Sequence, residues 1–160
     1  MKTVLITGAN KDIGFATAKL FLNNGYHVIL AGRSEQRLID AKEKQNNAVE
    51  YVVWDVSDIQ QAPVALTQAH RYYGNIDTIV NNAGVVSDED ITGGDFLNKT
   101  EQAWDETMNV NLKGLFFAIQ AEAKYMIRNS ISGHIVNVCS EMSYRAAYNA
   151  YTISKWGALE

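Results

Sequence analysis

Runs rich in valine and isoleucine recur along the chain and are apolar at nearly every position. They occupy residues 3–7, 27–31, 49–54, 76–81 and 134–139. Uninterrupted apolar runs are typical of parallel strands, because both faces of a parallel sheet are covered by other elements. The pattern therefore predicts buried strands that run parallel to one another.

The segments between these runs show the apolar spacing of amphipathic helices. They cover residues 13–24, 35–45, 59–73 and 101–129. Strands that alternate with helices through right-handed crossovers form a doubly wound parallel sheet, so we expect an α/β, Rossmann-like fold. The polar insertion at residues 87–99 is expected to form a loop at a carboxyl end of the sheet.

Composition narrows the class of protein without changing this fold. The 160 residues are 47% hydrophobic and 20% charged, which fits a single globular domain over residues 1–160. The net charge of −4 contains no block of either sign, so we expect neither a nucleic-acid partner nor a membrane partner. Cys139 is the only cysteine and the histidines lack metal-ligand spacing. A cytoplasmic protein without a metal site is expected.

A glycine-containing turn follows the first strand and precedes the first helix. Residues 7–14 read TGANKDIG; Gly8 allows a tight turn and Gly14 allows close packing of helix and strand. Free N–H groups at the start of such a helix can bind the diphosphate of a dinucleotide, although an ordinary strand-to-helix turn is the alternative. The binding candidates here are Gly8, Asn10, Lys11, Asp12, Ile13 and Gly14.

The turn after the second strand bears on the choice of dinucleotide. An acidic residue at this point holds the ribose hydroxyls of NAD, whereas a basic residue accommodates the extra phosphate of NADP. Arg33 and Ser34 stand here, and Lys11 is a second cation that could reach the same phosphate. NADP(H) is therefore preferred over NAD(H), which stays possible because each cation could be an ordinary surface charge. A methyltransferase-like domain would place an acidic residue at this position.

A tyrosine and a lysine lie four residues apart near the end of the chain. Tyr151 and Lys155 share one helix face at this spacing, and an ammonium group beside a phenol favours the phenolate. Such a pair can exchange a proton with a carbonyl or alcohol oxygen. The spacing alone is common on surface helices, so its weight depends on the preceding motifs.

Several motifs in chain order resemble the classical short-chain dehydrogenase/reductase family. They are the glycine turn, the NNAG stretch at residues 81–84, Asn111, Ser140 and the Tyr151/Lys155 pair. Asp12 departs from the family pattern, because it replaces the middle glycine of the turn. Its carboxylate should weaken diphosphate binding unless it turns away, for example as the N-cap of a helix that begins at Ile13.

The resemblance implies a role for each matching residue. Asp55 and Val56 would lie at the adenine ring, although Asp55 could instead cap a helix before Ser57. The small residues of the segment Asn82, Ala83 and Gly84 would let the backbone approach the ribose and nicotinamide, although this stretch could be a simple turn.

The resemblance also implies the catalytic roles. Tyr151 would be the general acid–base, Ser140 the donor to the substrate carbonyl, and Lys155 the partner of both the ribose and Tyr151. Asn111 would kink a long helix and hold a water, with two solvent-facing asparagines, Asn109 and Asn111, as the alternative. The interval from Ser140 to Tyr151 is about two residues shorter than usual in the family, which leaves Ser143 as a reserve candidate.

The implied function is that of an oxidoreductase that transfers a hydride between NADP(H) and a small carbonyl or alcohol substrate. The alternative is a non-catalytic or degenerate dinucleotide-binding module, which Asp12 favours. The resemblance also implies a homodimer or homotetramer through helices at 104–129 and from residue 148 onward. Family members continue beyond residue 160, so we expect the C-terminal strands of the sheet to be missing and the 134–139 strand to be an edge.

Overall fold

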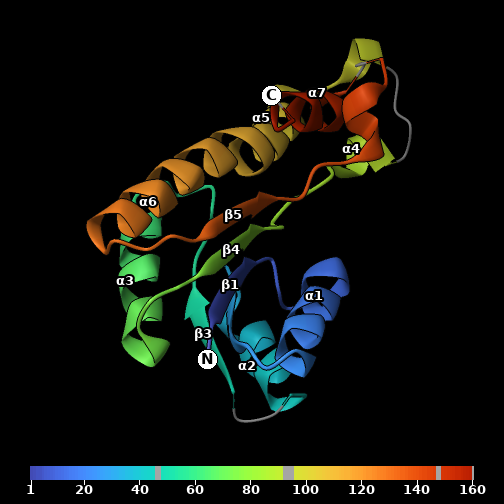
Figure 1. The fold of residues 1–160 in the computed structure, drawn as a ribbon. Helices are drawn as coiled ribbons and strands as arrows, with labels where there is room; N and C mark the ends of the chain where they lie inside the picture. The colour runs from blue at the N-terminus through green and yellow to red at the C-terminus, as the bar shows by residue number, and fades with distance from the viewer. Residues whose placement is uncertain (46–47, 92–95, 147–148, 160) are drawn as a thin grey trace.

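A five-stranded parallel sheet forms the centre of the molecule in the computed structural model, which describes residues 1–45, 48–91, 96–146 and 149–159. The strands are β1 (Thr3–Thr7), β2 (His27–Gly32), β3 (Val49–Val53), β4 (Thr78–Asn81) and β5 (His134–Asn137). Their order across the sheet is β3-β2-β1-β4-β5 (Figure 1). The strand order reverses direction at β1, so the crevice of a doubly wound sheet opens beyond the carboxyl ends of β1 and β4.

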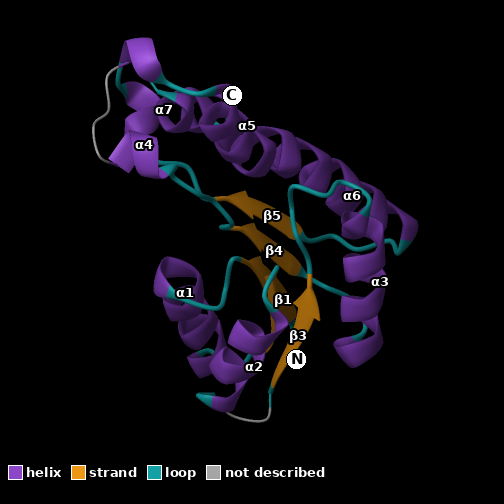
Figure 2. Ribbon diagram, turned by 180° about the vertical axis from the view of Figure 1, so that it is seen from behind, coloured by secondary structure: helices purple, strands orange, loops and turns teal. Residues whose placement is uncertain are grey.

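Helices cover both faces of the sheet, as Figure 2 shows. The face covered by α1 (Asp12–Asn23) and α2 (Glu35–Glu43) buries Val4 and Ile6 of β1. The opposite face, covered by α3 (Gln61–Tyr73) and α6 (Leu115–Arg128), buries Leu5 of the same strand. Alternate residues of one strand thus enter two separate cores, which is why the strands are continuously apolar. The predicted doubly wound α/β fold is confirmed.

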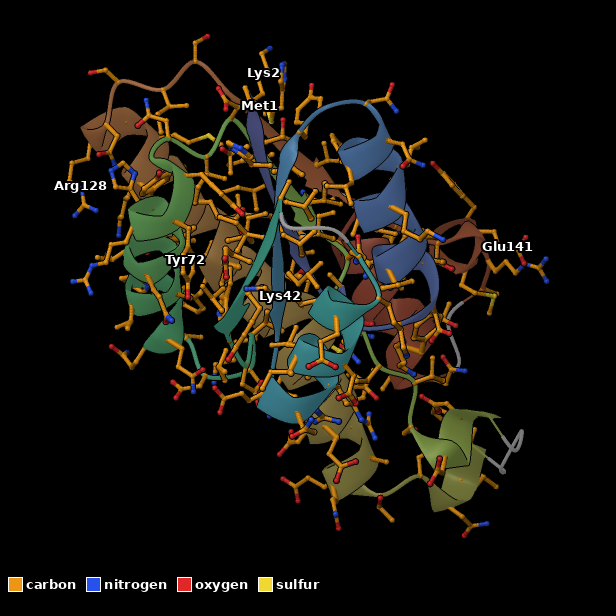
Figure 3. All side chains as sticks on the ribbon, turned by 90° about the horizontal axis from the view of Figure 1, so that it is seen from below. Met1, Lys2, Lys42, Tyr72, Arg128 and Glu141 are labelled. Atoms are coloured by element: carbon orange, nitrogen blue, oxygen red, sulfur yellow. The ribbon has the colours of Figure 1, made fainter. Side chains whose placement is uncertain are left out.

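Polar contacts fix the outer elements to this sandwich. Lys42 of α2, which is labelled in Figure 3, forms an ion pair of 2.6 Å with Glu50 of β3. On the other face, the Tyr125 hydroxyl of α6 accepts a hydrogen bond from the backbone N–H of Ile76 and lies 2.9 Å from Nδ1 of His70 in α3. None of the helices in the described ranges has the length and apolar character needed to cross a membrane.

The helix expected over residues 101–129 is interrupted. It consists of α5 (Glu101–Met108), a π-helical segment (Asn109–Gly114) and α6. At Gly114 a Cβ atom would lie 2.5 Å from the carbonyl oxygen of Val56, so only glycine lets this segment approach the turn after β3 so closely. The π-helical segment contains Asn111, the position at which the resemblance implies a kink.

The insertion at residues 87–99 is not simply a loop, and that prediction was wrong. It contains a short helix, α4 (Asp88–Ile91), and a 3₁₀ turn (Phe96–Asn98), while residues 92–95 lie outside the described part of the chain. Local hydrogen bonds explain the start of α4, since the N–H of Asp90 donates to the carbonyl and the hydroxyl of Ser87. A second 3₁₀ turn (Glu141–Tyr144) and helix α7 (Ala150–Gly157) follow β5, which lies at a sheet edge as expected.

Candidate active site

The turns after β1 and β4 are bonded to each other at the carboxyl end of the sheet. The Thr7 hydroxyl accepts hydrogen bonds from the backbone N–H groups of Asn82 (3.1 Å) and Ala83 (3.0 Å). The Asn82 side chain donates in return to the carbonyls of Thr7 (3.0 Å) and Gly8 (3.3 Å). This network holds the predicted NNAG segment against the predicted glycine turn.

Two glycines of the first turn are required by close approaches. Gly8 has a φ of +65°, and a Cβ there would lie 3.0 Å from the Cα of Ala83. A Cβ on Gly14 would lie 2.4 Å from the carbonyl oxygen of Gly8, so a side chain would force helix α1 away from the turn. Asn10 reaches the end of β2, where its Oδ1 would lie 3.4 Å from a Cβ on Gly32, and Ile13 is largely exposed.

Asp12 is the first residue of α1, not its N-cap. Lys11 occupies the N-cap position and makes no side-chain capping bond, so the capping role considered for Asp12 is wrong. The Asp12 backbone has a φ of +48°, where an N-cap residue would be extended, and its carboxylate lies 3.2 Å from Lys11 Nζ. Its side chain is 76% exposed. The carboxylate at the start of α1 is therefore exposed to solvent and paired with Lys11.

A polar cleft of about 970 Å³ opens at the turns after β2, β3 and β4. Arg33 from the turn after β2, Val85 from the turn after β4 and Lys113 from the π-helical segment line it. Arg33 is exposed at this cleft, whereas Lys11 is paired with Asp12. Ser34 follows as the N-cap residue of α2 and makes no side-chain capping bond.

Asp55 and Val56 form the turn between β3 and α3. The Asp55 carboxylate accepts hydrogen bonds from the backbone N–H (3.0 Å) and the hydroxyl (2.7 Å) of Ser57. It therefore stabilises its own turn, but it does not cap α3, which begins only at Gln61. Val56 is buried in the core and Ser57 lines the cleft.

Asn111 joins three elements near the end of β4. Its Oδ1 accepts from the N–H of Val85, and its Nδ2 donates to the carbonyl of Val85 (both 2.8 Å) and to the hydroxyl of Ser154 in α7 (3.1 Å). Asn111 is 2% exposed, so the solvent-facing alternative is wrong for it, while Asn109 is half-buried. These bonds explain why the helix switches to the π form here, since they hold the Asn111 side chain against the β4 turn.

Helix α7 carries Tyr151 and Lys155, and both are positioned by neighbours. Asn149 caps the helix by accepting from the N–H of Thr152 (2.8 Å). Lys155 is only 7% exposed, and its Nζ donates to the carbonyl of Val138 (3.0 Å). Burial lowers the pKa of this ammonium group below its usual value. No carboxylate pairs with Lys155 among the described residues, so its charge is available to an oxygen-rich ligand.

Gly84, Asn111 and Lys155 converge at one point. A Cβ on Gly84 would lie 3.5 Å from Asn111 Oδ1 and 3.6 Å from Lys155 Nζ. The backbone of the β4 turn, a satisfied amide and a buried ammonium group therefore meet at the carboxyl end of the sheet. Residues from three separate segments of the chain form this point of contact.

The two serine candidates differ in what their hydroxyls do. Ser143 is buried, and its hydroxyl donates to the carbonyl of Lys155 at 2.7 Å. This bond commits Ser143 to holding α7 and leaves it unsuited to the reserve role. The Ser140 hydroxyl accepts from the N–H of Met142 (3.2 Å) and donates to no residue in the described ranges. Ser140 is therefore the serine with a free donor.

Two contributors to this site lay outside the sequence prediction. Ser154 was detectable, because it lies three positions after Tyr151 and so near the same helix face. Val85 contributes only backbone groups to Asn111, and no side-chain pattern indicates such a contact.

Comparison with known proteins identifies the family. The family model described as short chain dehydrogenase matches residues 2–160. An uncharacterised oxidoreductase of Staphylococcus saprophyticus is 34% identical over 96% of this chain and 66% of its own length. A 3-oxoacyl-[acyl-carrier-protein] reductase of Thermotoga maritima is 35% identical over 99% of this chain and 64% of its own length. The chain thus spans slightly less than two thirds of these relatives.

Solved structures agree with this result. A short chain dehydrogenase from Mycobacterium smegmatis superimposes with a TM-score of 0.90 at 30% identity, over 99% of this chain and 67% of that one. An actinorhodin polyketide ketoreductase determined with NADPH gives a TM-score of 0.88 at 25% identity, over 99% of this chain and 61% of that one. Fold, motif order and sequence similarity agree, and the chain belongs to the short-chain dehydrogenase family of oxidoreductases.

Proposed function

We propose that the chain is a single dinucleotide-binding domain of an NADP(H)-dependent oxidoreductase that acts on a small carbonyl or alcohol. The observation that carries this proposal is the convergence of Gly84, Asn111 and Lys155, with Lys155 one helical turn after Tyr151. A buried ammonium group without a carboxylate partner in the described part of the chain is costly unless a ligand uses it.

The residues that would hold the dinucleotide fit its chemistry. The diphosphate would lie over the N–H groups at the start of α1, and Gly8 and Gly14 let this turn, the β4 turn and α1 pack closely beside it. Arg33 would bind the additional phosphate of NADP at the rim of the 970 Å³ cleft, and Lys11 could join it once it leaves Asp12. The cofactor of the NADPH-bound ketoreductase supports NADP(H) as the preferred dinucleotide, with NAD(H) as the weaker one.

The side chains of α7 would handle the proton. A reduced nicotinamide, when bound, supplies a hydride to a carbonyl carbon. The Tyr151 phenol would donate its proton to the carbonyl oxygen, and the Ser140 hydroxyl would donate a hydrogen bond to the same oxygen. The Lys155 ammonium would stabilise the phenolate that remains, while Asn111 would keep the β4 turn and α7 in register around it.

The chemistry of the relatives supports the substrate class. Two similar proteins are a 3-oxoacyl-[acyl-carrier-protein] reductase and a polyketide ketoreductase, and these names support a ketone as the substrate. We propose in addition that the protein works in the cytoplasm on small molecules, as a homodimer or homotetramer, without nucleic-acid or membrane partners.

Binding and turnover assays test the proposal. The chain is titrated with NADPH and NADH by nicotinamide fluorescence, and NADPH oxidation is then followed by absorbance with a panel of ketones and aldehydes. We expect tighter binding of NADPH and measurable turnover. Replacing Tyr151 by Phe should reduce kcat about 100-fold or more while dinucleotide affinity stays within about twofold. Failure to bind either dinucleotide would refute the proposal.

A non-catalytic dinucleotide-binding module is the second candidate, and the charged Asp12 at the start of α1 favours it. It predicts binding without turnover. The Tyr151→Phe variant separates the two candidates. An enzyme would lose turnover in this variant, whereas a module would show no change in either the binding or the turnover assay.

A further inference from the structure

The insertion between β4 and α5 is bonded to the first turn of helix α7. Asp90, in α4, accepts a hydrogen bond through Oδ2 from the backbone N–H of Tyr151 at 3.3 Å. Its other oxygen, Oδ1, lies 3.0 Å from Lys99 Nζ. The Asp90 side chain is 3% exposed and that of Lys99 is 19% exposed. A largely buried ion pair thus links both flanks of the insertion to the backbone of Tyr151.

The physical role of this contact follows from the start of α7. The first N–H groups of a helix have no partner within the helix, and its N-terminal end favours a negative charge. Asn149 provides an acceptor for Thr152, and Asp90 provides one for Tyr151. The acceptor for Tyr151 comes from 61 positions earlier in the chain. A contact from outside the helix fixes its first turn against another element, which a local cap does not do.

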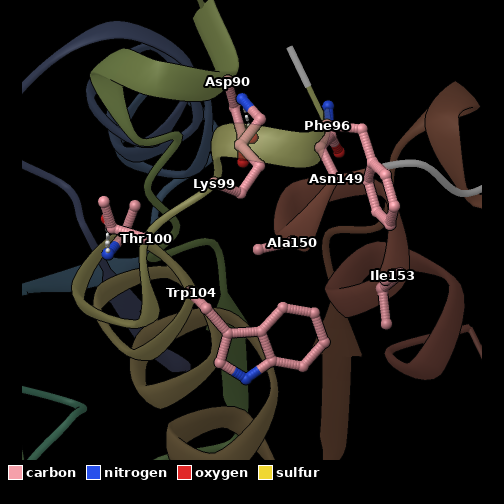
Figure 4. A pocket seen from close by; sticks show the side chains of 9 residues that line it. Asp90, Phe96, Lys99, Thr100, Trp104, Asn149, Ala150 and Ile153 are labelled. Carbon is pink, nitrogen blue, oxygen red and sulfur yellow. Dashed lines mark hydrogen bonds and ion pairs between the residues drawn. The ribbon is translucent and has the colours of Figure 1, made fainter. Parts of the chain in front are cut away.

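The same pair borders a small cavity between the insertion, α5 and α7 (Figure 4). Its volume is about 60 Å³, and the side chains of Trp104 from α5 and Ile153 from α7 line its far side. These elements are therefore in contact around Asp90 and Lys99, but a space remains between them. Because of this space, side-chain packing alone does not fix the position of α7. The hydrogen bond from Tyr151 to Asp90 therefore contributes to holding the helix in place.

We infer that Asp90, held in place by Lys99, is a positioning residue that fixes the first turn of α7 and thereby the direction of the Tyr151 phenol. The inference rests on the proposed function, because Tyr151 matters as a proton donor only in that reaction. Asp90 contacts the backbone of Tyr151, so it acts through Tyr151 without touching a reacting atom. A displacement of about 1 Å of a reacting group can cost about 100-fold in rate.

Variants at both members of the ion pair test the inference. Asp90→Ala removes the acceptor and the charge, Asp90→Asn keeps an oxygen acceptor, and Lys99→Met removes the cation. Glu43→Gln, at an exposed carboxylate in α2 far along the chain, is the matched control for loss of one negative charge. Turnover, NADPH affinity and binding stoichiometry, and amide hydrogen exchange of the α7 peptide are measured for each.

We expect kcat of Asp90→Ala to fall about 10- to 100-fold, with NADPH affinity within about twofold and one NADPH still bound per chain. Asp90→Asn should recover part of this loss, Lys99→Met should lie between the two, and Glu43→Gln should match the unchanged protein. Exchange of the first-turn amides of α7 should accelerate in Asp90→Ala. The retained stoichiometry separates misplacement of Tyr151 from general unfolding, which would reduce bound NADPH and kcat together.

Each contrary outcome identifies what is wrong. Full turnover in Asp90→Ala, or a parallel loss of NADPH binding and turnover, overturns the positioning role. Absence of dinucleotide binding by the unchanged protein overturns the proposed function instead. In that case the exchange of the α7 amides still decides whether Asp90 fixes the position of Tyr151, and unchanged exchange in Asp90→Ala overturns the inference.

Discussion

At the scale of single residues, Asp12 shows how a departure from a family motif is accommodated. The φ of Asp12, +48°, lies in the left-handed region, which glycine adopts without strain. Aspartate tolerates this region better than most other residues. Its carboxylate pairs with Lys11 at the start of α1, and both side chains are largely exposed. An exposed pair of this kind is worth little, so Lys11 can leave it to bind another anion.

We predict that Asp12→Gly raises the affinity for NADPH about five- to tenfold. The variant removes a negative charge close to the diphosphate and frees Lys11 for phosphate. The thermal midpoint should change little, because relief of backbone strain, roughly 1 kcal/mol, is offset by the greater chain entropy of glycine, about 0.5–1 kcal/mol. Fluorescence titration and thermal unfolding measure the two effects.

Asp12→Asn serves as the control for this prediction, because it keeps the bulk and removes only the charge. An affinity gain equal to that of Asp12→Gly assigns the effect to charge. If neither variant binds NADPH more tightly, Asp12 does not oppose the diphosphate and the prediction fails.

At the scale of elements, the π-helical segment connects the sheet to helix α7. Asn111 satisfies both backbone groups of Val85 and also bonds Ser154, so three elements depend on one buried amide. Removing one side of a buried hydrogen bond leaves its partner unsatisfied, which costs about 1–3 kcal/mol per group. The segment is therefore a structural junction as well as a part of the candidate site.

Asn111→Ala should lower the free energy of unfolding by about 2–4 kcal/mol, since the N–H and carbonyl of Val85 both lose their partner. Asn109→Ala, in the same segment but half-buried, is the matched control and should cost less than about 1 kcal/mol. Urea unfolding of both variants gives the comparison. Equal losses in the two would show that Asn111 has no special structural role.

The elements also show how far sequence reasoning extends. Continuous apolar runs located every strand, although β4 and β5 are shorter than predicted. The prediction of burial was wrong for β5, because it lies at the sheet edge and His134, Val136 and Asn137 are exposed. The Tyr151/Lys155 pair could be identified from the sequence, because helical spacing alone places the two residues on one face. The π-helical segment and the contact from Asp90 to Tyr151 depend on partners many positions away. Periodicity within a segment carries no information about such partners.

At the scale of the whole molecule, one buried carboxyl group couples the fold to pH. Glu122 of α6 is fully buried against the sheet. Its Oε2 accepts from Asn81 Nδ2 at 2.9 Å, and its Oε1 has no partner within the described ranges. Burial raises the pKa of Glu122 from 4.5 to about 7, while the bond from Asn81 opposes this rise. The folded protein therefore holds a proton that the unfolded chain releases near pH 4.5.

This proton determines how the free energy of unfolding depends on pH. Between pH 4.5 and about 7, folding takes up a proton at Glu122, so its contribution to stability is complete below pH 4.5 and is lost as the pH rises through about 7. Above that pH, the charged carboxylate costs on the order of 3 kcal/mol.

Glu122→Gln is neutral at every pH and retains an acceptor for Asn81. Its free energy of unfolding relative to the unchanged protein should therefore increase by on the order of 3 kcal/mol from pH 4.5 to pH 8. Urea unfolding across this range measures the difference, with Glu43→Gln as the exposed control that should show no such trend. A difference that stays constant with pH would mean that Glu122 is already ionised in the folded protein and that its buried charge is stabilised.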